Sequence, residues 1–301
     1  MSESRRPDHR IEWITLAAIL VCYGLWGLAM FRLAAVAPVT AILVIGVLIA
    51  FHASLTHEVL HGHPFRDRRW NEVTMLLPLN LCIPYRRFRD LHLAHHREPI
   101  LTDPYDDPES NYLDPAVWAA MPRWRRWLLR LNNTLLGRIL LGPALGQARF
   151  FHDELQALRA GGGAVWLAWG LHLPGAAAVL ALVAVSPMPV WAYLTAAYLG
   201  LGLLKIRTFL EHRAHEDARA RTVIIEDRGP LALLFLNNNL HVVHHMHPTA
   251  PWYRLPALYR ARKAQYLARN LGYAYRSYGQ IFRRHFWRAK DPVPHPLWPE
   301  G

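Results

Sequence analysis

The chain has 301 residues, of which 52% are hydrophobic and 19% charged, so it is more apolar than an ordinary soluble protein. Its two cysteines, Cys22 and Cys82, exclude a disulfide-rich scaffold, and Cys22 lies in an apolar run, where a cysteine usually serves packing. The formal net charge of +12 would suit nucleic acid, but the basic residues flank long apolar segments. That placement favours contact with anionic lipid headgroups.

Four apolar segments predict an all-α integral membrane protein. A helix of ~20 apolar residues is long enough to cross a bilayer. The segments lie at about 13–31, 38–55, 164–185 and 190–210. Short turns at Ala37-Pro38 and at 186–189 join them in pairs, so we expect two helical hairpins.

Two stretches between the hairpins have a different character. Residues 73–85 are apolar, but the run is short and contains Pro78 and Pro84, so we expect a partly buried or interfacial segment and no span. Residues 118–160 mix tryptophans and leucines with arginines. Such a basic amphipathic stretch either lies on a membrane surface or packs against the rest of the protein, and the sequence leaves both alternatives open.

Histidines gather in four short clusters, each near the end of an apolar segment. The clusters are His57-Glu58-Val59-Leu60-His61 with His63, His92-x-x-His95-His96, His212 with His215, and His241-x-x-His244-His245 with His247. Residues at positions i, i+3 and i+4 share one face of a helix. Neutral imidazole binds iron, zinc, copper and nickel, so histidines assembled from distant parts of one chain predict a metal site.

The number of histidines favours two metal ions over one. The predicted ligands are His57, His61, His92, His95, His96, His212, His241, His244 and His245. A zinc ion in a tetrahedral site takes four ligands, so this set is too large for one such ion. It fits two ions that each take five or six ligands.

The distribution of charge predicts the orientation of the chain. The hairpin turns carry little charge, with Arg32 as the exception, whereas the N-terminus, the loops with the histidines and the tail from Tyr253 are basic. By the positive-inside rule these basic parts face the cytoplasm. We therefore expect one domain, residues 1–301, in which residues 57–160 and 211–301 form a cytoplasmic helical cap. Both termini and the metal site would be cytoplasmic, with a bacterial inner membrane as the expected location.

The histidine pattern resembles a known family. The three motifs that begin at His57, His92 and His241, spaced around two membrane hairpins, are similar to the histidine boxes of the membrane fatty acid desaturase superfamily. The resemblance covers roughly residues 13–256. His212 resembles the additional ligand before the third box, and Asn237 resembles a water-mediated ligand of some desaturases. The short first box is also like that of bacterial members and carotenoid ketolases.

This resemblance implies a chemistry. The superfamily uses a non-haem di-iron centre, with O2 as co-substrate, to oxidise an unactivated C–H bond of a long apolar substrate. A fatty acyl chain is the first expectation, which makes the chain an acyl desaturase; a carotenoid ketolase or hydroxylase, or another lipid hydroxylase, is the alternative. An external electron donor such as a ferredoxin or rubredoxin is implied, and the basic cytoplasmic surface would suit an acidic donor.

Two other classes compete with this interpretation. His57-Glu58-x-x-His61 also satisfies the zinc-protease motif, with Glu58 as general base, although such an enzyme has no use for the other boxes. A histidine-rich metal transporter would place its ligands midway along the spans, whereas these clusters lie at helix ends.

Several polar residues near the boxes have open roles. Glu58 and the aspartates Asp103, Asp106 and Asp107 are candidates to accept hydrogen bonds from the outer nitrogens of the ligands. His63, His215 and His247 could also contribute, and the sequence does not assign them.

Overall fold

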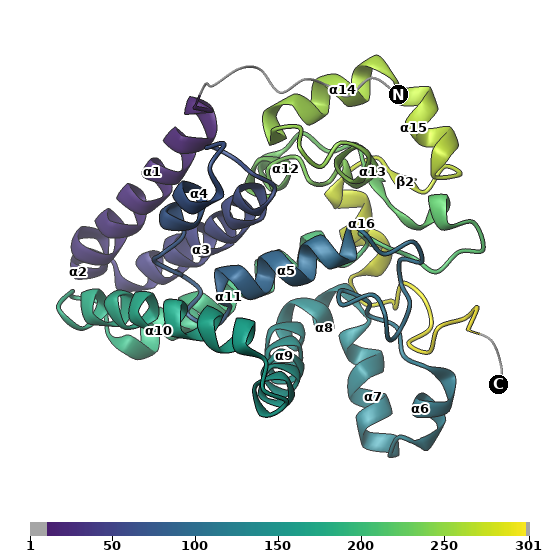
Figure 1. The fold of residues 1–301 in the computed structure, drawn as a ribbon, viewed down its shortest axis with the longest axis horizontal. Helices are drawn as coiled ribbons and strands as arrows, with labels where there is room; N and C mark the ends of the chain where they lie inside the picture. Colours follow the sequence, from purple (N-terminus) through teal and green to yellow (C-terminus); the bar gives the residue numbers. More distant parts are fainter. Residues whose placement is uncertain (1–10, 299–301) are drawn as a thin grey trace.

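The computed structural model describes residues 11–298, and it is built almost entirely from helices (Figure 1). The helices of the first half are α1 Trp13–Leu28, α2 Ala34–Val36, α3 Pro38–Leu60, α4 Arg68–Thr74, α5 Tyr85–His95, α6 Pro115–Ala120, α7 Arg123–Asn132, α8 Leu135–Leu140 and α9 Gly142–Arg159, with the π-helix Ala29–Leu33 between α1 and α2. The second half contains α10 Gly163–Ala184, α11 Val190–Thr208, α12 Pro230–Leu234, α13 His241–Met246, α14 Leu255–Ala261, α15 Lys263–Arg269 and α16 Tyr278–His285, with two 3-10 turns at Ala218–Arg221 and Trp252–Arg254. Strands β1 Ile224–Ile225 and β2 Ala274–Tyr275 form a short parallel pair.

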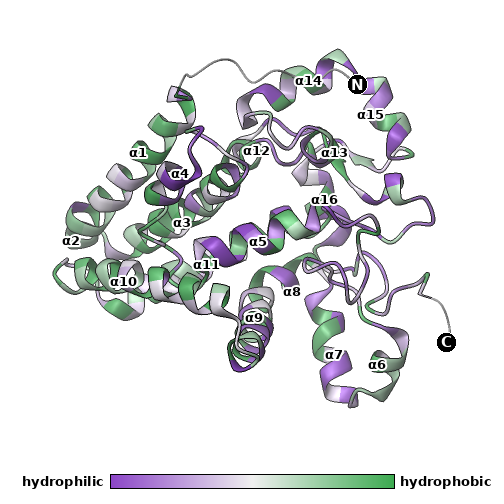
Figure 2. Ribbon diagram, viewed as in Figure 1, coloured by the Kyte–Doolittle hydropathy of each residue, from purple (hydrophilic) through white to green (hydrophobic). Residues whose placement is uncertain are grey.

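Three helical stretches are long and apolar enough to cross a membrane: Trp13–Val36, Pro38–Leu60 and Gly163–Ala184. Figure 2 shows them as the mostly hydrophobic side of the molecule, opposite the more polar region around α13 and α15. Their outward-facing side chains are apolar, such as Leu20, Val39 and Leu173. These stretches agree with three of the predicted spans, and the first two run five residues further than the sequence indicated.

The fourth predicted span corresponds to α11, which is 19 residues long and ends with Lys205 and Arg207. It falls outside the set of candidate spans within residues 11–298, so the two-hairpin topology remains a prediction. The basic residues predicted to face the cytoplasm at the N-terminus lie at positions 1–10, outside the described residues.

Helices α3 and α11 form the most extensive helix pair between residues 11 and 298. Small residues make this possible, because Gly46 and Gly200 face each other across the contact. A Cβ atom at Gly200 would lie 2.7 Å from the Gly46 carbonyl oxygen and 2.9 Å from the Ile49 Cβ atom. The two backbones therefore approach more closely than any larger side chain would permit.

The predicted interfacial stretch 73–85 forms no spanning helix. It continues from the end of α4 as a loop packed between the long helices, and Leu79 is fully buried. Tyr193 donates a hydrogen bond to the Leu79 carbonyl oxygen at 2.9 Å, and His172 Nε2 lies 2.9 Å from the Leu81 carbonyl oxygen. These partners satisfy backbone groups that would otherwise be costly next to lipid.

The stretch 118–160 divides into α6 to α9 and does not form one continuous helix. Helix α7 buries none of its residues, and Trp124 and Trp127 are exposed. Helices α8 and α9, in contrast, pack against α11. Packing against the protein therefore holds for α8 and α9, whereas contact with a membrane surface stays a prediction for α7, which keeps an exposed tryptophan-rich face.

We predict that Gly200→Val destabilises the protein by about 1–3 kcal/mol, because the added side chain must separate α3 from α11. Thermal unfolding of the detergent-purified protein should show a lower midpoint than the parent. The matched control is Gly170→Val on α10, where an added Cβ would meet no atom within 4 Å. An equal effect of the two substitutions would contradict the close-packing account.

Candidate metal centre

Four segments deliver the histidines to one place. His57 lies in the last turn of α3, and His61 follows at its C-terminal cap. Helix α5 carries His92 and His95, with His96 at its cap, and α13 carries the three histidines of the third box. His212 follows α11, in an isolated β-bridge with Thr222. Because each motif repeats with helical spacing, its rings point from one face into the same interior.

The structure sorts the nine predicted ligands into two groups. The first group contains His57, His61, His92, His96 and His244, and the second contains His95, His212, His241 and His245. Within each group, one ring nitrogen from every residue lies within 4.8 Å of the others. The groups adjoin, since the His96 and His245 rings stack with their centroids 4.2 Å apart.

The nitrogen positions fit a metal ion in each group. In the first group, His92 Nε2 lies 3.2 Å from His61 Nε2 and 3.0 Å from His96 Nε2. In the second, His212 Nε2 lies 3.0 Å from His95 Nε2 and 3.2 Å from His241 Nε2. Metal–imidazole bonds of about 2.1 Å place neighbouring ligand nitrogens roughly 3 Å apart. Buried His57 Nε2 has no hydrogen-bond partner between residues 11 and 298, as expected for an atom that binds an ion.

Carboxylates and an amide hold the outer nitrogens of three rings. Nδ1 of His92 lies 2.7 Å from Glu109 Oε1, and Nδ1 of His95 lies 2.7 Å from Asp107 Oδ1. In the second group, His241 Nδ1 lies 3.1 Å from the Asn238 side-chain oxygen. Each acceptor makes Nδ1 the protonated nitrogen, which leaves Nε2 free to bind a metal.

The electrostatics also favour neutral imidazoles. Burial, followed by repulsion from neighbouring imidazoles, lowers the pKa values of His212, His241 and His244 well below their usual range. His95 differs: burial acts to lower its pKa, but Glu109 and Asp107 outweigh burial and raise that pKa to about 9. Burial likewise opposes ionisation of Glu109, yet His92 and His95 hold its pKa well below the ordinary value. Neutral rings beside fixed negative charges suit a bound cation.

The sequence profile of the fatty acid desaturase family matches residues 33–277, which is most of the chain. The chain belongs to this family. The resemblance drawn from the histidine boxes is thereby confirmed, and the protein is an oxidoreductase of a membrane family. It is also similar to the beta-carotene ketolase of Paracoccus sp. (strain N81106 / MBIC 01143), with 27% identity over 223 residues, covering 71% of this chain and 73% of that enzyme. Both findings support an oxidase of the desaturase or hydroxylase type.

Two residues predicted to support the ligands, Glu58 and Asn237, have their hydrogen-bond partners outside the two histidine groups. Glu58 accepts a hydrogen bond from the Trp252 backbone N–H at 3.0 Å and faces His63. Asn237 donates to the Trp252 carbonyl oxygen at 3.2 Å, and its neighbour Asn238 is the residue that contacts His241. Glu58 therefore connects the first box to the backbone that follows the third box, and Asn237 connects the segment before the third box to the same backbone.

The other open residues also lie outside the two groups. His63 and Glu58 form a separate cluster with Glu12, in which His63 Nδ1 lies 2.7 Å from Glu12 Oε2. His247 Nε2 lies 3.0 Å from the Tyr266 hydroxyl, and His215 Nδ1 accepts the backbone N–H of Asp217 at 3.1 Å. Of the predicted aspartates, Asp103 accepts backbone N–H groups of its own loop, at Tyr105 and Asp106.

Two further carboxylates near the ligands, Glu109 and Glu211, were not predicted from the sequence. Glu109 lies 17 residues after His92, too far for any helical spacing to connect them. Glu211 is buried, and its Oε1 accepts a hydrogen bond from Asn238 at 3.1 Å and pairs with Arg207 Nε at 3.3 Å. The available signal for Glu211 was a charged residue that directly precedes a predicted ligand, His212, at the end of an apolar run, because a charge buried there must have a partner.

The zinc-protease interpretation does not fit this geometry. A protease of that type needs the glutamate beside the ion held by its two histidines. Here Glu58 is occupied by Trp252 and His63, while His57 and His61 share their group with three further histidines.

We predict that Asp107→Asn lowers metal affinity by about 10–100-fold, because His95 loses the carboxylate that fixes its tautomer. The measurement is the chelator concentration that removes half of the bound metal. Asp106→Asn is the matched control, since this neighbouring side chain is exposed and the carboxylate has no partner within residues 11–298. Equal metal retention in the two variants would refute the role given to Asp107.

Proposed function

We propose that this protein is an O2-dependent di-iron oxidoreductase that acts on an unactivated C–H bond of a long apolar substrate. The observation that carries the proposal is the assembly of nine histidines into two adjoining groups with their metal-binding nitrogens turned inward. Membership of the fatty acid desaturase family supports the same chemistry.

The donor set supports iron most directly in the five-histidine group, and the four-histidine group adjoins it. No cysteine belongs to either group, which disfavours the sites that soft metals prefer. Five imidazoles exceed the four ligands of a tetrahedral zinc site, whereas iron accepts five or six ligands. The bound iron pair would supply the activation of O2 that removal of hydrogen from such a C–H bond requires.

The protein's own residues prepare the site for this reaction. Asp107, Glu109 and Asn238 hold His95, His92 and His241 in the tautomer that presents Nε2 inward. The first box lies at the end of α3, where an apolar chain can reach it from the bilayer. For desaturation, two electrons, two protons, O2 and two substrate hydrogen atoms give a double bond and two water molecules; for hydroxylation, an alcohol and one water result.

A fatty acyl chain is the first proposed substrate, in line with the matched family. Carotenoid oxidation is the second candidate, and the similarity to the beta-carotene ketolase favours it specifically. Both substrates are long and apolar, so each suits an approach from the membrane.

We also propose the following setting for the reaction. The protein is a single domain with α11 as the fourth span, and the cap with its metal centre lies on the cytoplasmic side of a bacterial inner membrane. The basic residues around the cap support this orientation. A soluble donor such as a ferredoxin or rubredoxin would deliver the electrons.

We expect the purified protein to bind about two iron ions per chain, one for each histidine group. His212→Ala should retain about one, because it removes a ligand from the four-histidine group only. His152→Ala, outside both groups and bonded to Gln156, is the control and should keep the parent content. A stoichiometry of one zinc per chain would overturn the di-iron proposal.

Expression in a host that makes both fatty acids and carotenoids should change one lipid class. New double bonds or hydroxyl groups in acyl chains support the first candidate, and oxygenated carotenoids support the second. The change should disappear with His244→Ala, which removes a ligand from the five-histidine group, and remain with His152→Ala. An unchanged lipid and pigment profile in cells with iron-loaded protein would contradict both substrate assignments.

A further inference from the structure

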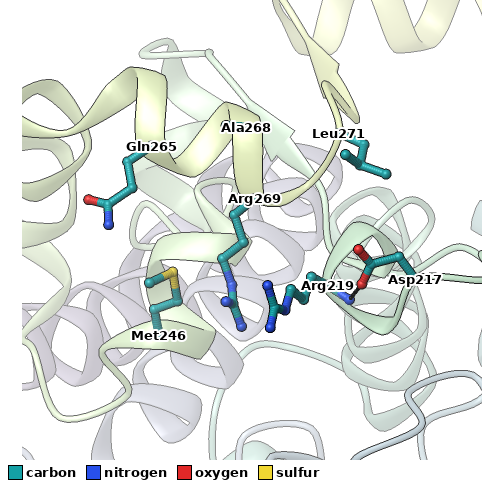
Figure 3. A pocket seen from close by; sticks show the side chains of 7 residues that line it. All are labelled: Asp217, Arg219, Met246, Gln265, Ala268, Arg269 and Leu271. Atoms are coloured by element: carbon teal, nitrogen blue, oxygen red, sulfur yellow. Dashed lines mark hydrogen bonds between the residues drawn. The ribbon is translucent and has the colours of Figure 1, made fainter.

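A hollow of about 340 Å³ opens on the surface beside the third histidine box (Figure 3). It is lined by Asp217, Arg219, Met246, Gln265, Ala268, Arg269 and Leu271. These residues come from α13, from α15 and the turn after it, and from the 3-10 turn near residue 218. Neither the family nor the nine-histidine site accounts for this hollow.

Two arginines in this hollow lack partners. Figure 3 shows the side chains of Arg219 and Arg269 extending toward each other. Both residues are exposed, and neither guanidinium forms a salt bridge or hydrogen bond with another residue between 11 and 298. Asp217, the acidic residue in the lining, uses its Oδ1 atom to accept the Arg219 backbone N–H at 2.8 Å. Two converging positive charges of this kind attract an anionic group from outside.

The hollow lies next to the metal centre. Met246 lines it, and this residue directly follows His245, whose Nε2 lies 3.2 Å from His241 Nε2 in the second group. A contact between His247 and Tyr266 also ties the end of α13 to α15. An electron that enters here has a short covalent path to a predicted ligand.

The location and the charge indicate a soluble, acidic partner. Helices α13 and α15 lie on the side of the molecule away from α1 and α10, so the hollow faces away from the apolar helices (Figure 1). From Arg254 to Arg269 the sequence has five basic residues and no acidic one. Leu271, 58% exposed, and half-buried Met246 add apolar surface among these charges, a combination typical of protein interfaces.

We propose that this hollow docks a small acidic one-electron carrier protein, whose surface carboxylates bind Arg219 and Arg269. The inference rests on the proposed function, because that reaction consumes two electrons per turnover. Two molecules of reduced carrier would each be oxidised by one electron, and the electrons would pass beside Met246 toward the metal ions that the histidines would hold. Opposite charges would steer the encounter and set the orientation of the carrier.

The test compares two charge-reversal variants of the iron-loaded, detergent-purified protein. In Arg219→Glu/Arg269→Glu, the KM for a reduced plant-type [2Fe–2S] ferredoxin should rise by at least about tenfold, because attraction becomes repulsion. Turnover with the small-molecule reductant dithionite should stay unchanged. The matched control is Arg123→Glu/Arg125→Glu on the exposed face of α7, which changes the net charge equally at a distance from the hollow and should leave both activities unchanged.

Distinct results overturn the docking proposal and the proposed function. An unchanged ferredoxin KM in the hollow variant, or an equal rise in the α7 control, overturns the docking site. A higher KM for the lipid substrate with an unchanged ferredoxin KM assigns the arginines to a substrate anion and also overturns it. If Arg219→Glu/Arg269→Glu does not fold, Arg219→Gln/Arg269→Gln takes its place, with a smaller KM rise expected. If the parent protein with dithionite oxidises no lipid, the proposed function itself fails.

Discussion

The arrangement depends on one constraint: a neutral imidazole has a single N–H, so each buried ring can donate from one nitrogen only. Where Asp107, Glu109 or Asn238 accepts a hydrogen bond from Nδ1–H, the lone pair is on Nε2 and points to the interior. Inside, Nε2 of these three rings lies about 3 Å from Nε2 of His61 or His212, the spacing expected of neighbouring ligands on one metal ion. The outer acceptors thus direct the Nε2 lone pairs to positions where a bound cation would accept them.

The long helices α3 and α11 fix the positions at which the first box and His212 enter the site. Helix α3 ends in the first box, and α11 leads to His212, so the contact at Gly46 and Gly200 sets the distance between ligands of the two groups. The loop at residues 75–84 is held by contacts with Tyr193 and His172, and it leads into α5, which carries the second box. A rigid scaffold of this kind holds ligand positions within the narrow tolerance that a metal site requires.

Much of the fold and of the metal-binding site could be predicted from the sequence, because helices leave recognisable lengths and spacings of residues in it. Apolar length identified three candidate spans, and helical spacing identified the histidines of the three boxes, whereas His212 was predicted from its resemblance to a family ligand. The features that the sequence did not indicate depend on contacts that no residue spacing encodes. Glu109 reaches His92 through a loop, Asn238 rather than Asn237 turns toward His241 because of local backbone direction, and the first two spans extend further than composition alone indicated. Whether α11 spans the membrane stays a prediction, because its last turn carries Lys205 and Arg207 and it is not among the candidate spans of residues 11–298.

The adjacent histidine pairs in the second and third boxes determine how far apart the two groups lie. His95 belongs to one group and His96 to the other, and His244 and His245 are divided in the same way. The separation between the two groups is therefore built into the length of a peptide unit, repeated on two helices that face each other. Movements of the cap can tilt or shift the centre as a whole, but they cannot pull its halves apart without breaking a helical turn. Each pair of adjacent histidines fixes the distance between the two groups. An insertion between the two residues of a pair would be expected to uncouple the groups even if every ligand were retained.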